Sequence, residues 1–293
     1  MSNHPSTIML FKIAFVICIF LLRTAHSWAQ DNENELGWSD TAELTAVFTE
    51  GNSAARTIGF KNELIYKWNN STFTTDIGSL RAESTEITRS AVGDSPQNFQ
   101  IVKNSVTSLT AKSDYARVRY DQAMSPRTFW YTSSGWEKNT FSGIQNRYSF
   151  GAGLGNTFFE TNRTGLRTSY GVSYTIQDDV IENPDGHNRF AGIRLSYDYN
   201  VTFNSNTKFT SVLLADENLS DISDFRVDFV NSIAVNLVSK LALKFSWQLL
   251  YDFQPSLVAI PLVNSKNMPS GVAVNIDLDR MDNLVTFALV ATF

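Results

Sequence analysis

Strict alternation of apolar and polar residues is the feature that most constrains this chain. From Leu166 to Gln177, the even positions are Leu, Thr, Tyr, Val, Tyr and Ile, and the odd positions are Arg, Ser, Gly, Ser, Thr and Gln. The same pattern recurs in 58–68, 225–237 and 241–253. A period of two places successive side chains on opposite faces of a strand, whereas helical spacing would mix the two sets. The chain is therefore predicted to be all-β.

Strand length and aromatic residues favour a membrane barrel over a soluble sandwich. The alternating segments are at least as long as the ~9–11 residues that a tilted strand needs to cross a bilayer, whereas soluble strands usually have about five or six. Their apolar faces end in Tyr, Trp or Phe, which is typical of the aromatic girdles at membrane interfaces. We therefore predict a transmembrane, antiparallel, up-and-down β-barrel.

Twelve strands are predicted, at 38–49, 57–68, 71–83, 105–120, 128–138, 146–160, 166–178, 189–203, 207–216, 223–237, 241–254 and 280–293. The connections after even strands are short, and those after odd strands include the longer ones at 84–104, 179–188 and 255–279. Short periplasmic turns and longer external loops are the asymmetry expected of such barrels. Two points stay open: the outward face of the fourth strand, and an additional hairpin within 257–275.

The N-terminus predicts export. Met9–Leu22 is apolar except for Lys12, and Ser27-Trp28-Ala29 forms a small-x-small cleavage site. We expect a cleaved signal peptide at 1–29 and an outer-membrane barrel domain at 30–293, with an uncleaved anchor as the alternative. The single cysteine, Cys18, lies inside the signal segment. The barrel domain is therefore expected to have no disulfide, thiolate metal site or cysteine nucleophile.

The last ten residues, LVTFALVATF, continue the alternation to an aromatic end. Val285, Phe287, Leu289, Ala291 and Phe293 share one face of the predicted strand. We interpret four of them as the signal that the barrel-assembly machinery reads: Phe287, Leu289, Ala291 and Phe293. The expected location is the outer membrane of a Gram-negative bacterium, and the expected partners are that machinery and outer-membrane lipid.

The opposite faces of the strands carry charges of both signs, predicted to line the lumen. The candidates are Glu43, Lys61, Glu63, Lys67, Arg167, Arg194, Asp198, Arg226, Asp228, Lys244 and Asp252. Two interpretations remain open. In the favoured one, ion pairs and hydrogen bonds satisfy a small, largely filled interior. In the other, the charges line a narrow hydrated pore, although a selective pore would more typically carry a ring of one sign.

No cofactor, metal or catalytic residue is predicted. The glycines Gly151, Gly153 and Gly155 lie in an alternating strand without the Lys-Ser/Thr of a phosphate loop, and are expected to leave space for bulky lumen residues. His187 is the one histidine after the signal segment, so a zinc site or a histidine base is poorly supported. The loop carboxylates Asp178, Asp179, Glu182 and Asp185 do not have the spacing of a calcium-binding EF-hand. A net charge of −5 argues against a basic surface for nucleic acid.

Several short stretches of the chain are similar, in the same order, to the sequence pattern of one protein family. They are Gly37-Trp38, Gly51-Asn52-Ser53, 142–148 (SGIQNRY), 151–155 (GAGLG), 251–255 (YDFQP) and the final Phe293. Together they resemble the salt-induced outer membrane protein family, a domain of unknown function. The chain departs from the family pattern at Glu50, where Thr is common, and at Asn156, where an aromatic often follows. The resemblance implies an outer-membrane β-barrel and a response to salt, and implies no catalytic residue.

The favoured function is a non-enzymatic envelope protein, either structural or a narrow pore. A link to salt or osmotic stress is implied by the resemblance alone. Two other classes remain as alternatives: a lipase-like barrel enzyme, and an adhesin or receptor that binds through the loops at 84–104 and 255–279. The second alternative is supported by an apolar patch formed by Ile260, Leu262 and Val263.

Overall fold

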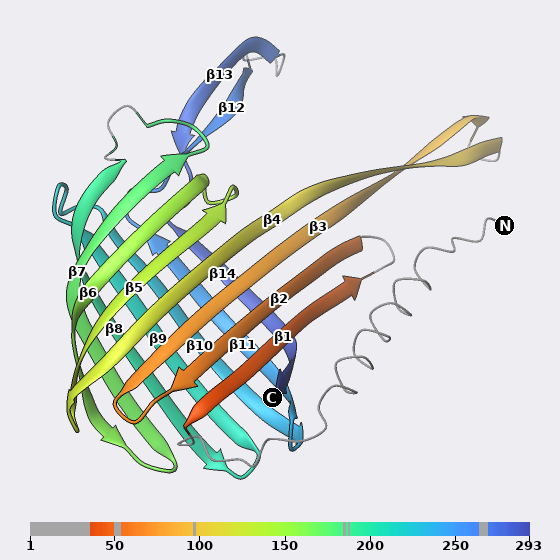
Figure 1. Cartoon of the computed structure of the whole chain (residues 1–293). Helices are drawn as coiled ribbons and strands as arrows, with labels where there is room; N and C mark the ends of the chain where they lie inside the picture. The colour runs from red at the N-terminus through yellow and green to blue at the C-terminus, as the bar shows by residue number, and fades with distance from the viewer. Residues whose placement is uncertain (1–35, 50–53, 96–97, 184–185, 187, 264–268) are drawn as a thin grey trace. The chain divides into compact units, whose positions relative to one another are not determined.

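Twelve strands of the described chain form one closed antiparallel barrel in the computed structural model (Figure 1). The structure describes residues 36–49, 54–95, 98–183, 186, 188–263 and 269–293. The barrel strands are β1 (Gly37–Thr49), β2 (Ala54–Lys67), β3 (Ser71–Ser95), β4 (Asn98–Ser125), β5 (Thr128–Asn139), β6 (Ile144–Glu160), β7 (Thr164–Asp179), β8 (Arg189–Asn204), β9 (Thr207–Asn218), β10 (Phe225–Val238), β11 (Leu241–Asp252) and β14 (Met281–Thr292). Each pairs with its neighbours along the chain, and β14 closes the ring between β11 and β1. The predicted twelve-stranded, up-and-down fold is confirmed.

The alternation seen in the sequence divides the barrel wall into an outer and an inner face. In β7, Tyr170 is 44% exposed, while its neighbour Ser169 is 4% exposed. Val172 and Tyr174 continue the exposed set, and Ser173 continues the buried one. Apolar side chains therefore point outward and small polar ones inward, which is the arrangement of a barrel immersed in lipid. Lipid requires such a closed sheet, because an open edge would leave backbone groups without hydrogen bonds.

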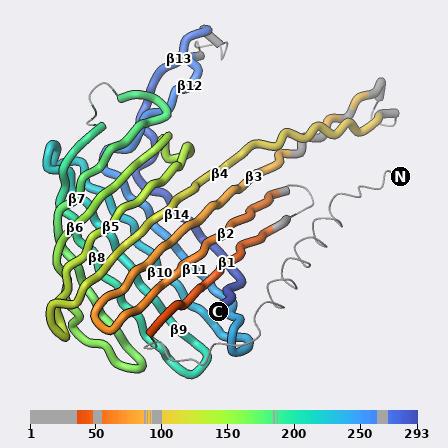
Figure 2. The backbone as a smooth tube through the Cα atoms, in the orientation of Figure 1, coloured from red at the N-terminus to blue at the C-terminus, as the bar shows by residue number. Residues whose placement is uncertain are grey.

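The register places both ends of the barrel sequence at one end of the barrel. β1 pairs with β14 from Thr41↔Thr292 to Thr45↔Ala288, and with β2 from Gly37↔Lys67 onward. The start of β1 thus lies beside the short turn between β2 and β3 (Figure 2), and the end of β14 lies beside the turn between β10 and β11, where Ala291 pairs with Leu241. The other short turns, after β4, β6, β8 and β10, are at the same end. This is the predicted periplasmic end.

Aromatic side chains form a belt at this end. Their rings follow one another across the strands at centroid separations of 4.6, 4.4, 6.4 and 5.6 Å, in the order Trp38, Tyr66, Trp68, Tyr120 and Trp130. Such amphipathic rings concentrate where hydrocarbon meets headgroups. In the described residues, no helix is long and apolar enough to cross a membrane. The closed sheet, its apolar exterior and the aromatic belt make this an outer-membrane protein, which confirms the predicted location.

The long connection between the third and fourth strands differs from its prediction as a loop at 84–104. β3 and β4 run on to Ser95 and Asn98, so most of that segment is strand. Beyond Thr85↔Thr107 the two strands pair only with each other, and they leave the barrel as a two-stranded ribbon (Figure 2). The sequence pattern missed the ribbon because its alternating positions carry Thr, Ser and charged residues rather than aromatics.

The hairpin left open within 257–275 is present. β12 (Leu257–Val263) pairs with β13 (Pro269–Asp277) as a separate two-stranded sheet between β11 and β14. It belongs to the end opposite the short turns, the predicted external side. The signal peptide at 1–29, the start of the barrel domain up to residue 35, Asp185 and His187 lie outside the described residues, so those predictions stay open.

Candidate functional site

Charged side chains on the inner face of the barrel are the candidate functional site. Several predicted lumen residues lie in ion pairs between strands. Lys244 Nζ lies 2.7 Å from Glu43 Oε1, and Arg194 Nη2 lies 2.8 Å from Asp216 Oδ2. The guanidinium of Arg226 lies 3.3 Å from Asp252 Oδ2. Because opposite charges lie together, the inner wall does not present charges of a single sign to a solute.

Two ion pairs join walls that face each other across the lumen. Arg117 on β4 lies 3.7 Å from Asp228 on β10, and five strands separate β4 from β10 in either direction around the ring. Arg147 on β6 lies 3.8 Å from Asp252 on β11, which is separated from β6 by at least four strands. Two opposite walls can make such contacts only where their side chains span the interior. These crossing pairs therefore narrow the lumen.

Glu137 on β5 holds the two crossing arginines together. Its Oε1 accepts a hydrogen bond from Arg147 Nη1 at 2.7 Å, and its Oε2 lies 3.8 Å from Arg117 Nη2. Gln177 on β7 accepts a second hydrogen bond from Arg147, at 2.7 Å. Gln248 Nε2 in turn donates to Asp228 Oδ1 at 2.7 Å. The crossing pairs are thus parts of a network that spans the barrel interior.

A second cluster lines the interior nearer the short-turn end. Asp121 on β4 lies 2.9 Å from Arg119 and 3.5 Å from Arg167. The two guanidiniums lie over aromatic rings, Arg119 over Tyr131 at 4.2 Å and Arg167 over Phe129 at 4.4 Å from the centroid. A cation over an aromatic face gains about 0.5–2 kcal/mol, depending on how far it is desolvated. The aromatic residues therefore fill space and hold the arginines in place.

The three lumen glycines make room for these bulky groups, as predicted. A Cβ at Gly151 would lie 2.8 Å from Ser133 Oγ and 3.1 Å from Arg194 Nη1. One at Gly153 would lie 2.9 Å from the ring of Tyr131, and one at Gly155 would collide with the ring of Phe129. The glycines thus allow side chains from neighbouring strands to lie flat against β6.

The remaining predicted residues also lie on inward-facing positions. Lys61 is 3.7 Å from Asp76, and Glu63 is the cross-strand neighbour of the same aspartate. Asp198 is the cross-strand neighbour of Arg167. Lys67 is on the same face of β2, opposite Gly37, at the end with the short turns. What these residues do for a solute stays a prediction.

Sequence reasoning missed about half of the network. The missed residues are Asp76, Arg117, Arg119, Asp121, Glu137, Arg147, Asp216 and Asp224. Three of the eight, Arg117, Arg119 and Asp121, lie on β4 and would have followed had the face of that strand been assigned. The signal was present, since Arg117, Arg119 and Asp121 alternate with the outward Val118 and Tyr120.

Asp179, one of the carboxylates predicted to lie in the loop at 179–188, is the last residue of β7 and takes part in hydrogen bonds within the protein. Asp179 Oδ1 accepts from Gln177 Nε2 at 2.6 Å and from Ser256 Oγ at 3.0 Å. Among the residues that the structure describes, no group of three or more His, Cys, Asp or Glu side chains is arranged to hold a metal ion.

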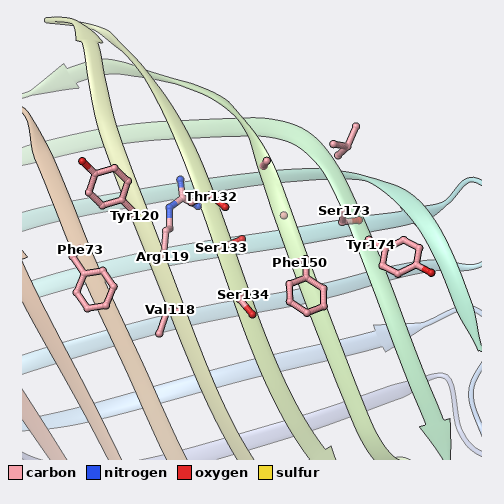
Figure 3. A pocket seen from close by; sticks show the side chains of 13 residues that line it. Phe73, Val118, Arg119, Tyr120, Thr132, Ser133, Ser134, Phe150, Ser173 and Tyr174 are labelled. Carbon is pink, nitrogen blue, oxygen red and sulfur yellow. The ribbon is translucent and has the colours of Figure 1, made fainter.

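A depression on the barrel wall lies over β3 to β7, with Thr132, Ser134 and Phe150 among its lining residues (Figure 3). Most of the lining side chains, including Tyr120 and Tyr174, belong to the outward-facing set. In an outer-membrane protein the outward-facing side chains of this depression face lipid, and Arg119 of the second cluster also contributes to its lining.

Comparison with known proteins gives one family match and several similar solved structures. A family model described as "Protein of unknown function, DUF481" matches residues 42–257. No curated protein matches the chain. Similar solved structures include an outer membrane channel from Pseudomonas putida F1, with 8% identity, a TM-score of 0.43, and coverage of 90% of this chain and 100% of that one.

Two other solved structures are similar over most of their length. The translocator domain of the autotransporter NalP from Neisseria meningitidis has 10% identity and a TM-score of 0.42, and the match covers 89% of this chain and 90% of that one. An anion-selective porin from Comamonas acidovorans has 8% identity and a TM-score of 0.37, with 87% and 98% covered.

Proposed function

The chain belongs to the DUF481 family of proteins of unknown function, and from that premise we propose that it is a non-enzymatic outer-membrane barrel whose interior is narrowed by ion pairs that cross it. It acts either as a structural element of the envelope or as a narrow pore for small ions. The observation that carries the proposal is the contact between Arg117 and Asp228, 3.7 Å apart on opposite walls.

The mixed charge of the network supports a narrow passage rather than a selective channel. A ring of one sign would concentrate counter-ions, whereas adjacent opposite charges cancel each other's field. Paired charges that also accept and donate hydrogen bonds hold their side chains in place. Any ion that passes must move between the arginines and carboxylates of the crossing pairs.

Solute exclusion tests the proposal. We expect liposomes that contain the wild-type protein to exclude monosaccharides in a swelling assay. The double variant Arg117→Ala/Asp228→Ala should admit them, because truncating both side chains removes the contact between the walls. Arg81→Ala is the matched control, since Arg81 pairs with Glu83 outside the lumen network at 2.7 Å. Rapid entry of monosaccharides through the wild-type barrel would contradict a narrowed interior.

The proposed link to salt or osmotic stress has a separate basis, the resemblance noted from the sequence. Ion pairs weaken as salt screens them, with a Debye length of about 8 Å at 0.15 M and about 3 Å at 1 M. Pairs in a hydrated lumen would loosen accordingly, and the passage would widen. A strain that lacks the protein should grow less well after a salt upshift. Equal growth of the deletion strain and the parent would contradict a role in salt stress. It would not bear on the proposal that the barrel interior is narrowed.

A further inference from the structure

Two of the stretches that carry the family resemblance meet across the external end of the barrel. One is 142–148, which runs from the turn after β5 into β6, and the other is 251–255, at the end of β11. At least four strands separate β6 from β11 around the ring. The ion pair between Arg147 and Asp252 is the inner part of this meeting. A second set of contacts lies at the ends of the strands.

The turn 140–143, which joins β5 to β6, reaches the opposite wall. Ser142 Oγ donates a hydrogen bond to Asp282 Oδ2 at 2.9 Å. Asp282 is on β14, which is separated from β5 and β6 by at least four strands. Next to Ser142, Gly143 lies so close to Ser256 that a Cβ at position 143 would collide with the Cβ of Ser256. The turn therefore spans the external mouth of the barrel.

The turn is held in this position from its own side. Asn139 Nδ2 donates to Ser142 Oγ at 2.9 Å, and Asn139 Oδ1 accepts from the N–H of Ser142 at 3.2 Å. The carbonyl of Gly143 accepts from the N–H of Val180 at 2.8 Å. Gly143 has a φ of 75°, a conformation that residues with a side chain rarely adopt. The geometry of the turn thus depends on this glycine.

The opposite side of the mouth is also tied to its neighbours. Ser256 Oγ donates to Asp179 Oδ1 at 3.0 Å, and the carbonyl of Ser256 accepts from the N–H of Leu278 at 3.0 Å. Gln254 Nε2 donates to Ser223 Oγ at 2.8 Å, which joins this segment to the loop between β9 and β10. The turn therefore meets a supported surface rather than a free loop.

Residues on both sides of the contact are buried. Ile144 and Ser256 are each 6% exposed, and Gly143 and Pro255 are buried as well. Segments that connect strands normally run over the protein surface and are exposed to water. Positions at the mouth of an open barrel would be exposed in the same way. Their burial indicates that the two sides of the mouth cover each other.

We propose that the turn 140–143 is a latch that closes the external mouth, and that the lumen is reached from outside only when this turn leaves Ser256 and Asp282. Opening requires only that the contacts of a short turn are released, while all twelve strands stay paired. Local openings of this kind need far less free energy than unfolding of the whole barrel. The latch is separate from the contact of Arg117 with Asp228, so it does not rest on the narrowing proposed above.

Access of a thiol reagent from outside tests the latch. In a Cys18→Ala background, Thr175→Cys places one thiol on the inner face of β7, at a buried position near its external end. Intact cells are treated with a maleimide dye too large for general porins, so that the reagent reaches position 175 through the external mouth of this barrel. Labelling should be slow while the latch is intact. Ser142→Ala/Ser256→Ala removes two hydrogen bonds of the latch and should speed labelling by about tenfold.

Gly143→Ala opens the latch in an independent way. Its Cβ collides with Ser256 and should push the turn away from the opposite wall. Gly271→Ala is the matched control, because Gly271 also has a positive φ, of 77°, but no atom lies within 4 Å of the position of its Cβ. Gly143→Ala should therefore speed labelling, and Gly271→Ala should not. Heat-modifiable mobility on a gel verifies that each barrel is folded.

Two results would overturn the proposal. One is rapid labelling of Thr175→Cys while the latch is intact. The other is an unchanged labelling rate in the folded double serine variant or in folded Gly143→Ala. Arg117→Ala/Asp228→Ala should leave labelling slow, because it does not touch the latch. Failure of the latch and failure of the narrowed lumen are thus separate results.

Chemical cross-linking tests the contact itself. In the same background, a short bifunctional maleimide should join the thiols of Ser142→Cys/Asp282→Cys, because the two side chains are in contact across the mouth. Ser142→Cys/Asn283→Cys is the matched control. Asn283 is on the other face of β14 by alternation, where Trp247 Nε1 donates to it at 3.1 Å. Equal joining at positions 282 and 283, or none at 282 in folded protein, would overturn the proposal.

Discussion

At the scale of single residues, the wall of the barrel is a boundary between two solvents. Phe245 on β11 packs against Phe287 on β14, with ring centroids 5.1 Å apart on the outer face. The adjacent Ser246 points inward, where its cross-strand neighbour Ser232 is buried. A change of one position along the strand thus exchanges lipid for the polar interior.

The two faces predict different costs for the same substitution. Phe245→Arg should destabilise the folded barrel by about 2–4 kcal/mol, because a guanidinium near the middle of a strand enters the hydrocarbon. Ser246→Arg should cost much less, and Phe245→Leu reports the loss of the aromatic contact alone. Denaturant-dependent unfolding in lipid vesicles measures all three. Equal costs at 245 and 246 would contradict the face assignment.

A second residue-scale prediction concerns close packing at the lumen glycines. A Cβ at Gly153 would overlap the carbonyl oxygen of Tyr170, which is backbone and cannot move aside. Gly153→Ala should therefore destabilise the barrel by about 1–3 kcal/mol. Gly135→Ala is the control, because its nearest neighbour is the rotatable hydroxyl of Ser149 at 3.2 Å. The free energies of unfolding of both variants are measured in the same vesicles. A similar cost for Gly153→Ala and Gly135→Ala would contradict the crowding at Gly153.

At the scale of elements, the regular strands were predictable and the external hairpins were not. Alternation with aromatic ends identified β7 and β11 because each face meets a different solvent. The ribbon formed by Ser84–Ser95 and Asn98–Asn104 lies outside the lipid, so nothing imposes an apolar face on it. β12–β13 was left open for the reverse reason, since its aliphatic run has no aromatic end to mark a membrane-crossing strand.

The last strand carries an element-scale prediction. β14 closes the barrel between β1 and β11, and Phe287, Leu289 and Ala291 share the outward face assigned to the assembly signal. Deletion of Phe293, which follows β14, should lower the amount of folded barrel in the outer membrane. Phe293→Tyr should not, because it keeps an aromatic at that position. Cell fractionation with heat-modifiable mobility measures the amount of folded barrel in the outer membrane for both variants. A normal amount after the deletion would contradict the proposed role of Phe293 in assembly.

At the scale of the whole molecule, the sequence predicts which residues face the lumen but not which of them meet. Alternation assigns Asp228 to the inner face, yet it carries no information about depth or about the opposite wall. The contact of Asp228 with Arg117 depends on the strand count and on the stagger accumulated around the ring. That long-range geometry decides whether charges line a passage or span it, and only the closed structure supplies it.

Single-channel conductance with exchanged charges tests the crossing contact most directly. Arg117→Asp alone and Asp228→Arg alone each place two like charges face to face. The side chains at positions 117 and 228 should then repel each other, and the conductance should rise above that of the wild type. The double variant Arg117→Asp/Asp228→Arg restores an opposite pair across the lumen and should return the conductance to the low wild-type level. If the increases in conductance caused by the two single substitutions instead add in the double variant, Arg117 and Asp228 do not narrow the lumen as a pair. The proposal of a barrel narrowed by crossing ion pairs would then be wrong.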